Sequence, residues 1–313
     1  MDAGPDDQDG PAVSSLCEPA VAVVIADPEG NPHLDACLEA YAAGLKVGDE
    51  LVAVVALAAP GLEALRRRHQ GVRFLQAPPG TLTPVLWARG LAAISAGLVR
   101  TTIAPCLPAP GWREALVLSH GGSTAAVGSA MEPAHAMRRR DWAVFFLRYR
   151  NFMLPMARHR VADVPGDAAS YRMDLLRGRV ELWSAGFWEN VVNADLVNSG
   201  EVLVLDPSVT VEYRGGEKAG RFVRQRFCHG IHYGRGRLTG AAPWRRISYA
   251  ALFVLPGAIF FMKITRDVLR RGRCRGRFLL CLPWLAVFLT AWSLGEWAGS
   301  LLGPRAGRGE PGR

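Results

Sequence analysis

Ala20-Val-Ala-Val-Val-Ile25 and Leu51-Val-Ala-Val-Val55 are short, continuous apolar runs, and they decide the fold. Runs of this kind are typical of strands that are covered on both faces, as in a parallel sheet. Between them, the residues from His33 to Ala43 place apolar side chains on one face of a predicted helix, which ends at Gly44. A strand, a helix and a second strand joined by short connections predict a parallel pair with a right-handed crossover.

The same alternation continues along the chain. It predicts strands at Val72–Leu75 and Val99–Ala104, helices at Pro60–Gln70, Pro84–Ala96 and Pro110–Leu118, and two late strands at Val202–Leu205 and Val209–Tyr213. From Gly121 to Asp163 the pattern is irregular, apart from a basic, aromatic-rich helix over Arg138–Leu147. We therefore predict an α/β fold with a Rossmann-type, mostly parallel sheet and helices on both faces. Ligands of such sheets bind beyond the carboxyl ends of the strands.

Two common nucleotide-binding classes are excluded by the turns. No GxGxxG or Walker A loop follows any predicted strand, which argues against a dinucleotide dehydrogenase and a P-loop NTPase. The six cysteines form no CxxC pair, so reduced, inert thiols are expected.

The charge of the chain points to an anionic partner. The formal net charge is +9, from 37 Lys and Arg residues against 28 Asp and Glu residues. Much of the excess lies late in the chain, beside apolar runs, which favours anionic lipids over nucleic acid.

The two ends of the chain differ from its middle. Residues 1–19 are acidic and rich in Gly, Pro and Ser, which predicts a disordered leader and not a signal peptide. We interpret residues 216–246 as a basic interfacial segment, residues 247–303 as a membrane-associated region and residues 304–313 as a tail. Phe278 to Leu302 is long enough to cross a bilayer, whereas Ile247 to Met262 is marginal and contains Pro256 and Gly257.

Six arginines lie between these two apolar segments, at positions 266, 270, 271, 273, 275 and 277. The positive-inside rule places both this loop and the basic stretch before Ile247 in the cytoplasm. We therefore expect Ile247 to Met262 to be re-entrant or interfacial and only Phe278 to Leu302 to cross. A hairpin that puts the arginine loop outside is the competing model.

Several blocks of the sequence, in their order, resemble the family 2 glycosyltransferases of the GT-A fold. The blocks are Val23–Asn31, Pro108–Leu116, Asp163–Arg172, Gly186–Asn190 and Arg224–Arg235. The resemblance covers roughly Ala20 to Gly303. It implies a nucleotide-sugar domain over residues 20–215, followed by C-terminal membrane helices.

The resemblance also implies a site. An inverting transfer needs a base that deprotonates the acceptor hydroxyl and a positive charge that neutralises the leaving diphosphate. By position in the family blocks, the base is Glu189, the nucleotide contacts are Asp27 and Glu29, and the acceptor or diphosphate contacts are Gly166, Arg172, Arg224, Gln225, Arg226 and Arg235. Alternatives remain open: Glu189 as a helix-start carboxylate, Asp27 and Glu29 as turn residues, and Arg172 as a surface arginine. Lipid headgroups are the alternative partners of Arg224, Gln225, Arg226 and Arg235.

The chain departs from the family at the metal motif. Ile103-Ala104-Pro105 replaces the Asp-x-Asp motif, and Tyr213 stands where a His is often found. Mg²⁺ or Mn²⁺ is usual in the family, but neither Ile nor Pro has a side-chain ligand for it, so no cofactor is expected. A cationic clamp formed by the late arginines would take the place of the metal.

Two functions follow from these observations. The first is a membrane-associated glycosyltransferase, with its main domain on the cytoplasmic side, that moves a sugar from a nucleotide sugar to a lipid-linked or cell-envelope glycan acceptor. The second is a catalytically inactive homologue that serves as a scaffold or regulator for a partner protein of the same pathway.

Overall fold

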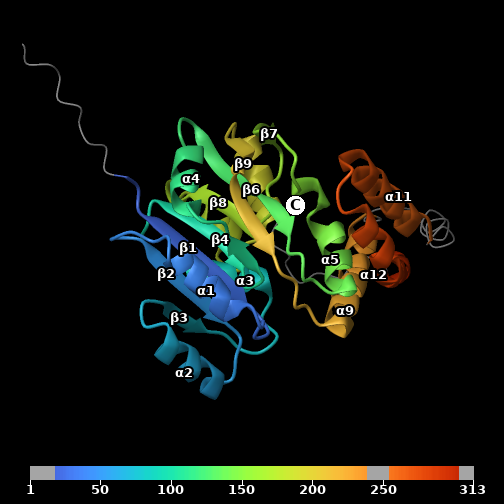
Figure 1. The fold of residues 1–313 in the computed structure, drawn as a ribbon, viewed down its shortest axis with the longest axis horizontal. Helices are drawn as coiled ribbons and strands as arrows, with labels where there is room; N and C mark the ends of the chain where they lie inside the picture. The colour runs from blue at the N-terminus through green and yellow to red at the C-terminus, as the bar shows by residue number, and fades with distance from the viewer. Residues whose placement is uncertain (1–17, 238–253, 303–313) are drawn as a thin grey trace, which may run out of the picture.

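The computed structural model describes residues 18–237 and 254–302, and a nine-stranded sheet forms its centre (Figure 1). The strands are β1 (Val21–Asp27), β2 (Glu50–Val55), β3 (Arg73–Gln76), β4 (Leu98–Ile103), β5 (Cys106–Pro108), β6 (Thr124–Pro133), β7 (His159–Val161), β8 (Ala168–Arg172) and β9 (Val202–Tyr213). Their order is β3-β2-β1-β4-β8-β6-β9-β5, and β7 pairs with β9.

Helices cover both faces of this sheet and form a layer at one end of it. They are α1 (Leu34–Ala42), α2 (Ala59–Arg68), α3 (Thr83–Leu91), α4 (Trp112–Ser119), α5 (Arg139–Arg148), η1 (Arg150–Phe152), α6 (Met173–Arg177), α7 (Val180–Trp183), α8 (Glu189–Asn198), α9 (Ala219–Arg237), α11 (Val254–Arg271) and α12 (Arg275–Leu302). The predicted helices of the first hundred residues are thus confirmed, with ends that differ by a few residues.

The first half of the sheet is the predicted parallel unit. The strands β3, β2, β1 and β4 pair in parallel and in register. Side chains of β1 alternate between two cores: Val23 and Ile25 pack with α1 and α4, and Val24 packs with α3 on the other face. A strand buried on both faces explains why its sequence is a continuous apolar run.

The second half of the sheet is mixed. Strand β8 runs antiparallel between β4 and β6, whereas β6 and β9 are parallel. The two predicted late strands are one strand, β9, in which the register against β6 shifts between Ser129 and Ala130 because Pro207 and its neighbours bulge out.

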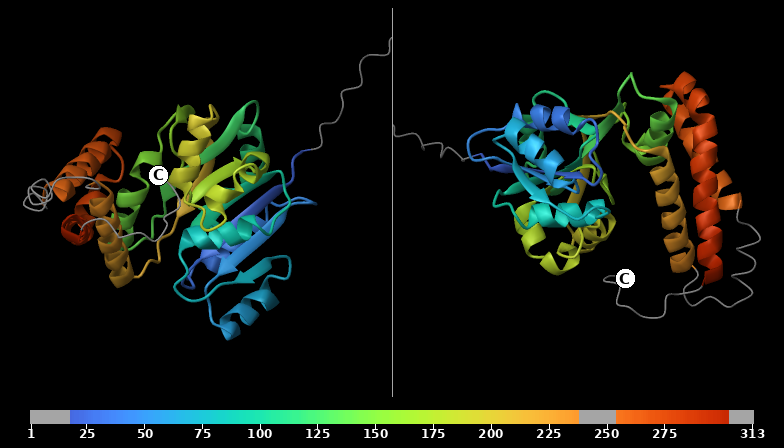
Figure 2. Two further views of the ribbon diagram at one scale, coloured as in Figure 1. Left: turned by 180° about the vertical axis from the view of Figure 1, so that it is seen from behind. Right: turned by 90° about the horizontal axis from the view of Figure 1, so that it is seen from below.

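The helices α9, α11 and α12 form a layer beside the domain (Figure 2, right). Of the residues that the structure describes, one helix is long and apolar enough to cross a membrane, and it is α12. The predicted leader lies largely outside the described residues, as do the tail and residues 247–253 of the first apolar segment.

Candidate functional site

A solvent-open cleft lies beyond the carboxyl ends of β1 and β4. The chain continues from β1 to β2 on one side and returns to β4 on the other, and ligands of α/β sheets bind at this kind of switch point. The turn from Ala26 to Pro32 forms one wall, and residues 103–105 form the floor. The other wall comes from Arg148 at the end of α5 and from residues between Gly216 and Gln225.

Asp27 and Glu29 lie in this cleft, as predicted for nucleotide contacts, but both have partners in the protein. Asp27 is buried and accepts hydrogen bonds from the backbone N–H groups of Glu29 (3.3 Å) and Asn31 (3.0 Å). Burial raises the pKa of Asp27 to about 6, although the backbone N–H groups of Asn31 and Gly30 oppose the shift. Glu29 forms an ion pair with Arg221 of α9. Asp27 therefore closes the turn, and Glu29 ties the turn to α9.

The floor of the cleft offers no side-chain ligand for a metal. Ile103 and Ala104 are buried at the end of β4, and Pro105 follows them. Tyr213 is fully buried at the end of β9, where its ring packs 5.0 Å from that of Tyr149. In residues 18–237 and 254–302, no three His, Cys, Asp or Glu side chains are gathered in a way that could hold a metal ion. The residues present therefore do not fit the divalent ion that the family resemblance implies.

Arg148 connects the cleft to the interior of the domain. Its guanidinium donates to Asp167 Oδ2 (2.5 Å) and to Glu217 Oε1 (2.9 Å). The hydroxyl of Tyr149 donates to the same oxygen of Asp167 (2.5 Å). Burial raises the pKa of Glu217, and Arg148 opposes this shift. The result is a compact group of one arginine and two carboxylates beside the cleft.

Glu189 lies next to this group. It is the first residue of α8, so the structural alternative of a helix-start carboxylate describes its position. Its side chain packs on Gly166: a Cβ atom at Gly166 would lie 3.0 Å from both Cβ and Cγ of Glu189. Burial of the carboxyl, followed by the negative charge of Asp167, raises the pKa of Glu189 to about 7. A carboxyl with such a pKa can accept a proton near neutral pH.

The four predicted contacts on α9 separate in the structure. Gln225 lines the cleft. Arg224 is exposed and is not among the residues that line it. Arg226 packs over the rings of Phe222 (5.1 Å) and Trp292 (5.3 Å), and burial lowers its pKa to about 10. Arg235 lies ten residues beyond Gln225, about 15 Å along the helix.

Arg172 lies at the opposite end of the sheet. It pairs with Leu98, the first residue of β4, whereas the cleft begins at Ile103, the last residue of that strand. Its guanidinium donates to Asp174 (2.6 Å) at the surface. The structure therefore does not bring Arg172 to the cleft, and its position matches the alternative of a surface arginine.

Sequence reasoning missed several residues of the site. They are Arg148, Asp167, Glu217 and Lys218, and Arg221 was assigned to the membrane surface alone. Asp167 directly follows Gly166, which had been selected, and Glu217 is an acidic residue that opens an otherwise basic segment. Arg148 gave no signal, because it follows the buried apolar run Trp142–Leu147 at the end of a helix that already begins with arginines.

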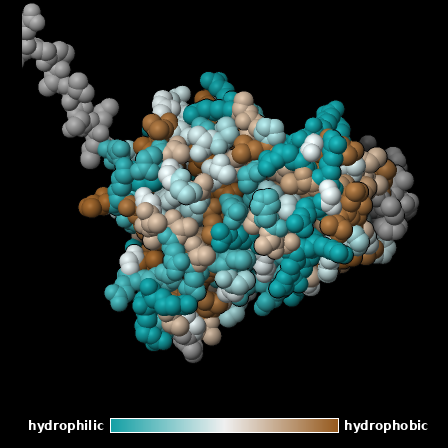
Figure 3. Space-filling model, in the orientation of Figure 1, coloured by the Kyte–Doolittle hydropathy of each residue, from teal (hydrophilic) through white to brown (hydrophobic). Residues whose placement is uncertain are grey.

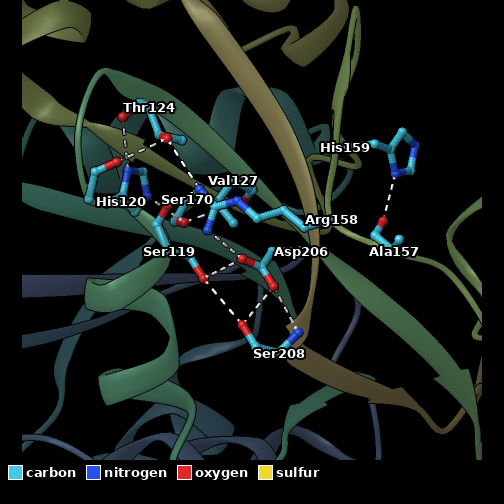
Figure 4. A network of polar contacts seen from close by, with 11 residues as sticks. Ser119, His120, Thr124, Val127, Ala157, Arg158, His159, Ser170, Asp206 and Ser208 are labelled. Carbon is cyan, nitrogen blue, oxygen red and sulfur yellow. Dashed lines mark hydrogen bonds and ion pairs between the residues drawn. The ribbon is translucent and has the colours of Figure 1, made fainter.

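A second polar network contains a serine, a histidine and an aspartate, but it is not a catalytic triad (Figure 4). His120 Nε2 lies 2.8 Å from Ser170 Oγ, and both residues are buried. The other ring nitrogen of His120 faces the carbonyl of Thr124, at 3.4 Å, rather than a carboxylate. Asp206 instead accepts from Ser119 (2.9 Å) and Arg158 (2.8 Å). These groups join α4 to the sheet, and no carboxylate orients His120 as a catalytic triad requires.

Comparison with known proteins identifies the fold. No family model matches the chain, and no curated protein matches its sequence. In structure it is similar to the mannosyltransferase PcManGT from Pyrobaculum calidifontis in complex with GDP-Man and Mn²⁺, at 14% identity and a TM-score of 0.55, over 91% of this chain and 88% of that one. A weaker likeness links it to GalNAc-T7 with UDP, GalNAc and Mn²⁺, at 13% identity and a TM-score of 0.47, over 62% and 44%. The fold of this protein is therefore GT-A-like: a mixed α/β sheet with helices on both faces.

Proposed function

We propose that this protein transfers a sugar from a nucleotide-sugar donor to an acceptor hydroxyl, as family 2 glycosyltransferases do with inversion. One observation carries the proposal: the cleft at the switch point between β1 and β4 has a wall that contains Arg148, Lys218 and Arg221, and it adjoins a carboxyl with a pKa of about 7. PcManGT, whose fold is similar, holds GDP-Man and Mn²⁺. The same fold in this chain supports a nucleoside diphosphate sugar as the donor.

The diphosphate would be bound by side-chain cations instead of a metal. Arg148, Lys218 and Arg221 line the cleft opposite the turn that follows β1. Arginine forms strong, charge-assisted hydrogen bonds with phosphate oxygens. This set would replace the clamp expected from Arg224, Arg226 and Arg235, because the cations that line the cleft come from the end of α5, from the residue before α9 and from the first turn of α9.

Glu189 would be the base. Above pH 7 its carboxylate can take the proton of the acceptor hydroxyl while the hydroxyl oxygen attacks the sugar. Gly166 gives Glu189 its position, since any larger side chain would meet the Glu189 stem. Asp167 orients Arg148 and adds the negative charge that makes Glu189 more basic.

The acceptor would be a lipid-linked or cell-envelope glycan, and the protein would work at a membrane from the cytoplasmic side. Support comes from α9, whose first turns line the cleft while its remaining turns pack on the apolar helix α12. An acceptor held at a membrane surface would therefore meet the cleft at α9.

A catalytically inactive homologue that acts as a scaffold or regulator is the second candidate. It is favoured by the apolar floor at residues 103–105 and by Asp27, whose carboxylate oxygens are occupied by backbone N–H groups. Under this proposal a partner protein of the same pathway would carry the chemistry.

Thermal unfolding with common nucleotides and nucleotide sugars, with and without Mn²⁺, separates the two candidates. Ligand that binds only the folded state raises its stability, by about 2.7 kcal/mol at a hundredfold excess over Kd. We expect one nucleotide class to raise the Tm equally with and without Mn²⁺. No stabilisation by any nucleotide would rule out the enzyme, and stabilisation that needs Mn²⁺ would rule out the metal-free cleft.

A further inference from the structure

The helices α9 and α12 are fixed to each other by glycines on both sides. Gly230 and Gly234 of α9 face Gly295 and Gly299 of α12. A Cβ atom at Gly230 would lie 2.3 Å from the carbonyl oxygen of Trp292, and one at Gly295 would lie 2.1 Å from that of Phe227. The two backbones are therefore in contact, as in closely packed helix pairs with small residues four apart.

This pair is parallel. Phe222 packs against Phe288 near its start, with ring centroids 4.7 Å apart, and Gly234 lies against Ser300 near its end. Parallel helices in backbone contact have nearly the same angle to any membrane. An interfacial α9 and a crossing α12 are therefore incompatible, and the two expectations drawn from the sequence cannot both hold.

The first half of α12 lies against the GT-A domain. Phe278 packs on Phe146 of α5, with ring centroids 5.5 Å apart, and Arg277 lies over the ring of Trp142 (5.8 Å). The loop before α12 is also bound to the domain, since Arg273 forms an ion pair with Glu132 (2.6 Å). The arginine loop is thus on the same side of any membrane as the domain. The part of α12 that lies beyond Leu285 is about 25 Å long, shorter than the hydrocarbon core of a bilayer.

The outer face of α12 is apolar along its whole length. Leu280, Val287, Leu294 and Leu301 are exposed and follow each other at seven-residue intervals. This stripe runs beside the domain as well as beside α9, and α11 extends it with Leu255, Ile259 and Met262. Figure 3 shows apolar residues gathered at the end of the molecule that α11 and α12 form.

We propose that α12 does not cross the bilayer but lies in the membrane plane, with α9 and α11, and attaches the domain to one leaflet. A stripe that contacts lipid over its full length while the domain lies behind it requires a helix parallel to the surface. Figure 2 (right) shows α12 running along the side of the domain rather than away from it. Exposed Arg224 and His232 on α9 then stay near water instead of entering the hydrocarbon.

The exposed charges on α11 and α12 indicate which class of lipid this surface would bind. Exposed cations lie at the domain end of α11 and at the start of α12: Lys263, Arg266, Arg270, Arg275 and Arg277. Basic residues beside an apolar helix face bind anionic headgroups. The proposal therefore commits to an anionic leaflet, and it rests on the membrane association contained in the proposed function.

Depth measurements distinguish the two orientations. Single cysteines replace Leu280, Val287, Leu294 and Leu301 in a full-length chain whose Cys17, Cys228 and Cys274 are serine, and each carries a spin label on phosphatidylglycerol vesicles. An in-plane helix predicts four similar, shallow depths. A crossing helix predicts labels deepest at the middle positions and a label at position 301 that reagents reach from the vesicle lumen, and that result would overturn the proposal. A label at Leu118, exposed on α4, should remain in water.

Vesicle flotation supplies an independent test. Val287→Glu with Leu294→Glu should weaken binding roughly tenfold or more, whereas Leu118→Glu, the matched control on the far side of the sheet, should not change it. Glutamine at Arg270, Arg275 and Arg277 should remove the preference for phosphatidylglycerol over phosphatidylcholine. Equal binding by all variants would overturn the proposal. Nucleotide-sugar stabilisation, measured on the same proteins, shows whether the donor cleft is intact, so a failed membrane test and a failed enzyme test are distinguishable.

Discussion

The molecule contains two polar networks of similar size that behave in opposite ways. In the network around Asp206, burial alone would raise the pKa of the carboxyl, but hydrogen bonds from Ser208 and Ser119 and the charge of Arg158 hold it below its usual value. In the network beside the cleft, burial raises the pKa of Glu189 to about 7, and the nearby Asp167 adds to the shift.

The difference indicates a structural role for the network around Asp206 and a catalytic role for the network beside the cleft. A carboxylate whose oxygens are all bound stabilises the fold and is unreactive. A carboxyl kept among other carboxylates is less stable in its charged form and more basic, which is typical of catalytic groups. The four predictions below test this contrast, beginning with the largest expected effect.

Glu189→Gln should lower the transfer rate a hundredfold or more, the usual contribution of a general base. Nucleotide affinity should stay unchanged, because Glu189 does not line the described cleft. The measurement is initial-rate kinetics beside thermal shift, with Glu181→Gln, an exposed acid of α7, as the control. Equal rates for the two variants would show that Glu189 is not the base.

Asp206→Ala should cost roughly 2–3 kcal/mol of unfolding free energy, because it removes bonds from two serines and an arginine. Urea denaturation measures it. The cost should shrink as the pH falls, since a carboxyl with a lowered pKa stabilises the fold above its unfolded pKa and loses this effect on protonation. Nucleotide affinity that falls with stability would contradict the separation of the two networks.

Arg221→Gln should weaken nucleotide binding about tenfold, the effect of losing one charge-assisted contact. Arg224→Gln is the matched control, because Arg224 belongs to the same helix but is exposed outside the cleft. Calorimetry at two salt concentrations measures both. A larger loss for Arg224 than for Arg221 would move the diphosphate site away from the cleft.

The transfer rate should rise with pH up to a plateau above about pH 7, as Glu189 loses its proton. Asp167→Asn should move this inflection to lower pH by roughly half a unit to one unit, because it removes a negative charge and frees the charge of Arg148. The pH profile of kcat/KM measures the shift. A profile displaced to higher pH would contradict the electrostatic role of Asp167.

The parallel half of the sheet could be predicted because strands that are buried on both faces consist mostly of apolar residues. In β1 and β2, residues 21–26 and 51–55 are all apolar. Strand β6 could not be predicted, because it contains residues of low strand propensity, such as Ala125, Ala126 and Gly128. It forms a strand because it pairs with β8 on one side and with β9 on the other. The break at Pro207 likewise divided β9 into two predicted strands.

The site residues could likewise be predicted only where they follow a strand that the sequence reveals. Asp27 and Glu29 follow a recognisable strand, so their place at the sheet edge follows from topology. Arg172 also adjoins a strand, but β8 is antiparallel to β4, which places Arg172 at the other edge. The partners of Arg148 lie 19 and 69 residues away, in Asp167 and Glu217, and no local pattern encodes such contacts.

The glycine contact between α9 and α12 also affects when the donor cleft can reach its final structure during synthesis. Arg221 and Gln225 belong to α9 and Lys218 directly precedes it, yet Gly295 of α12, which Gly230 of α9 contacts, lies more than 60 residues later in the chain. In a nascent chain the α9 wall of the donor cleft therefore lacks its packing partner until the residues around Gly295 have left the ribosome. The helix that would attach the protein to a membrane is therefore also the one that supports the α9 wall of the donor cleft.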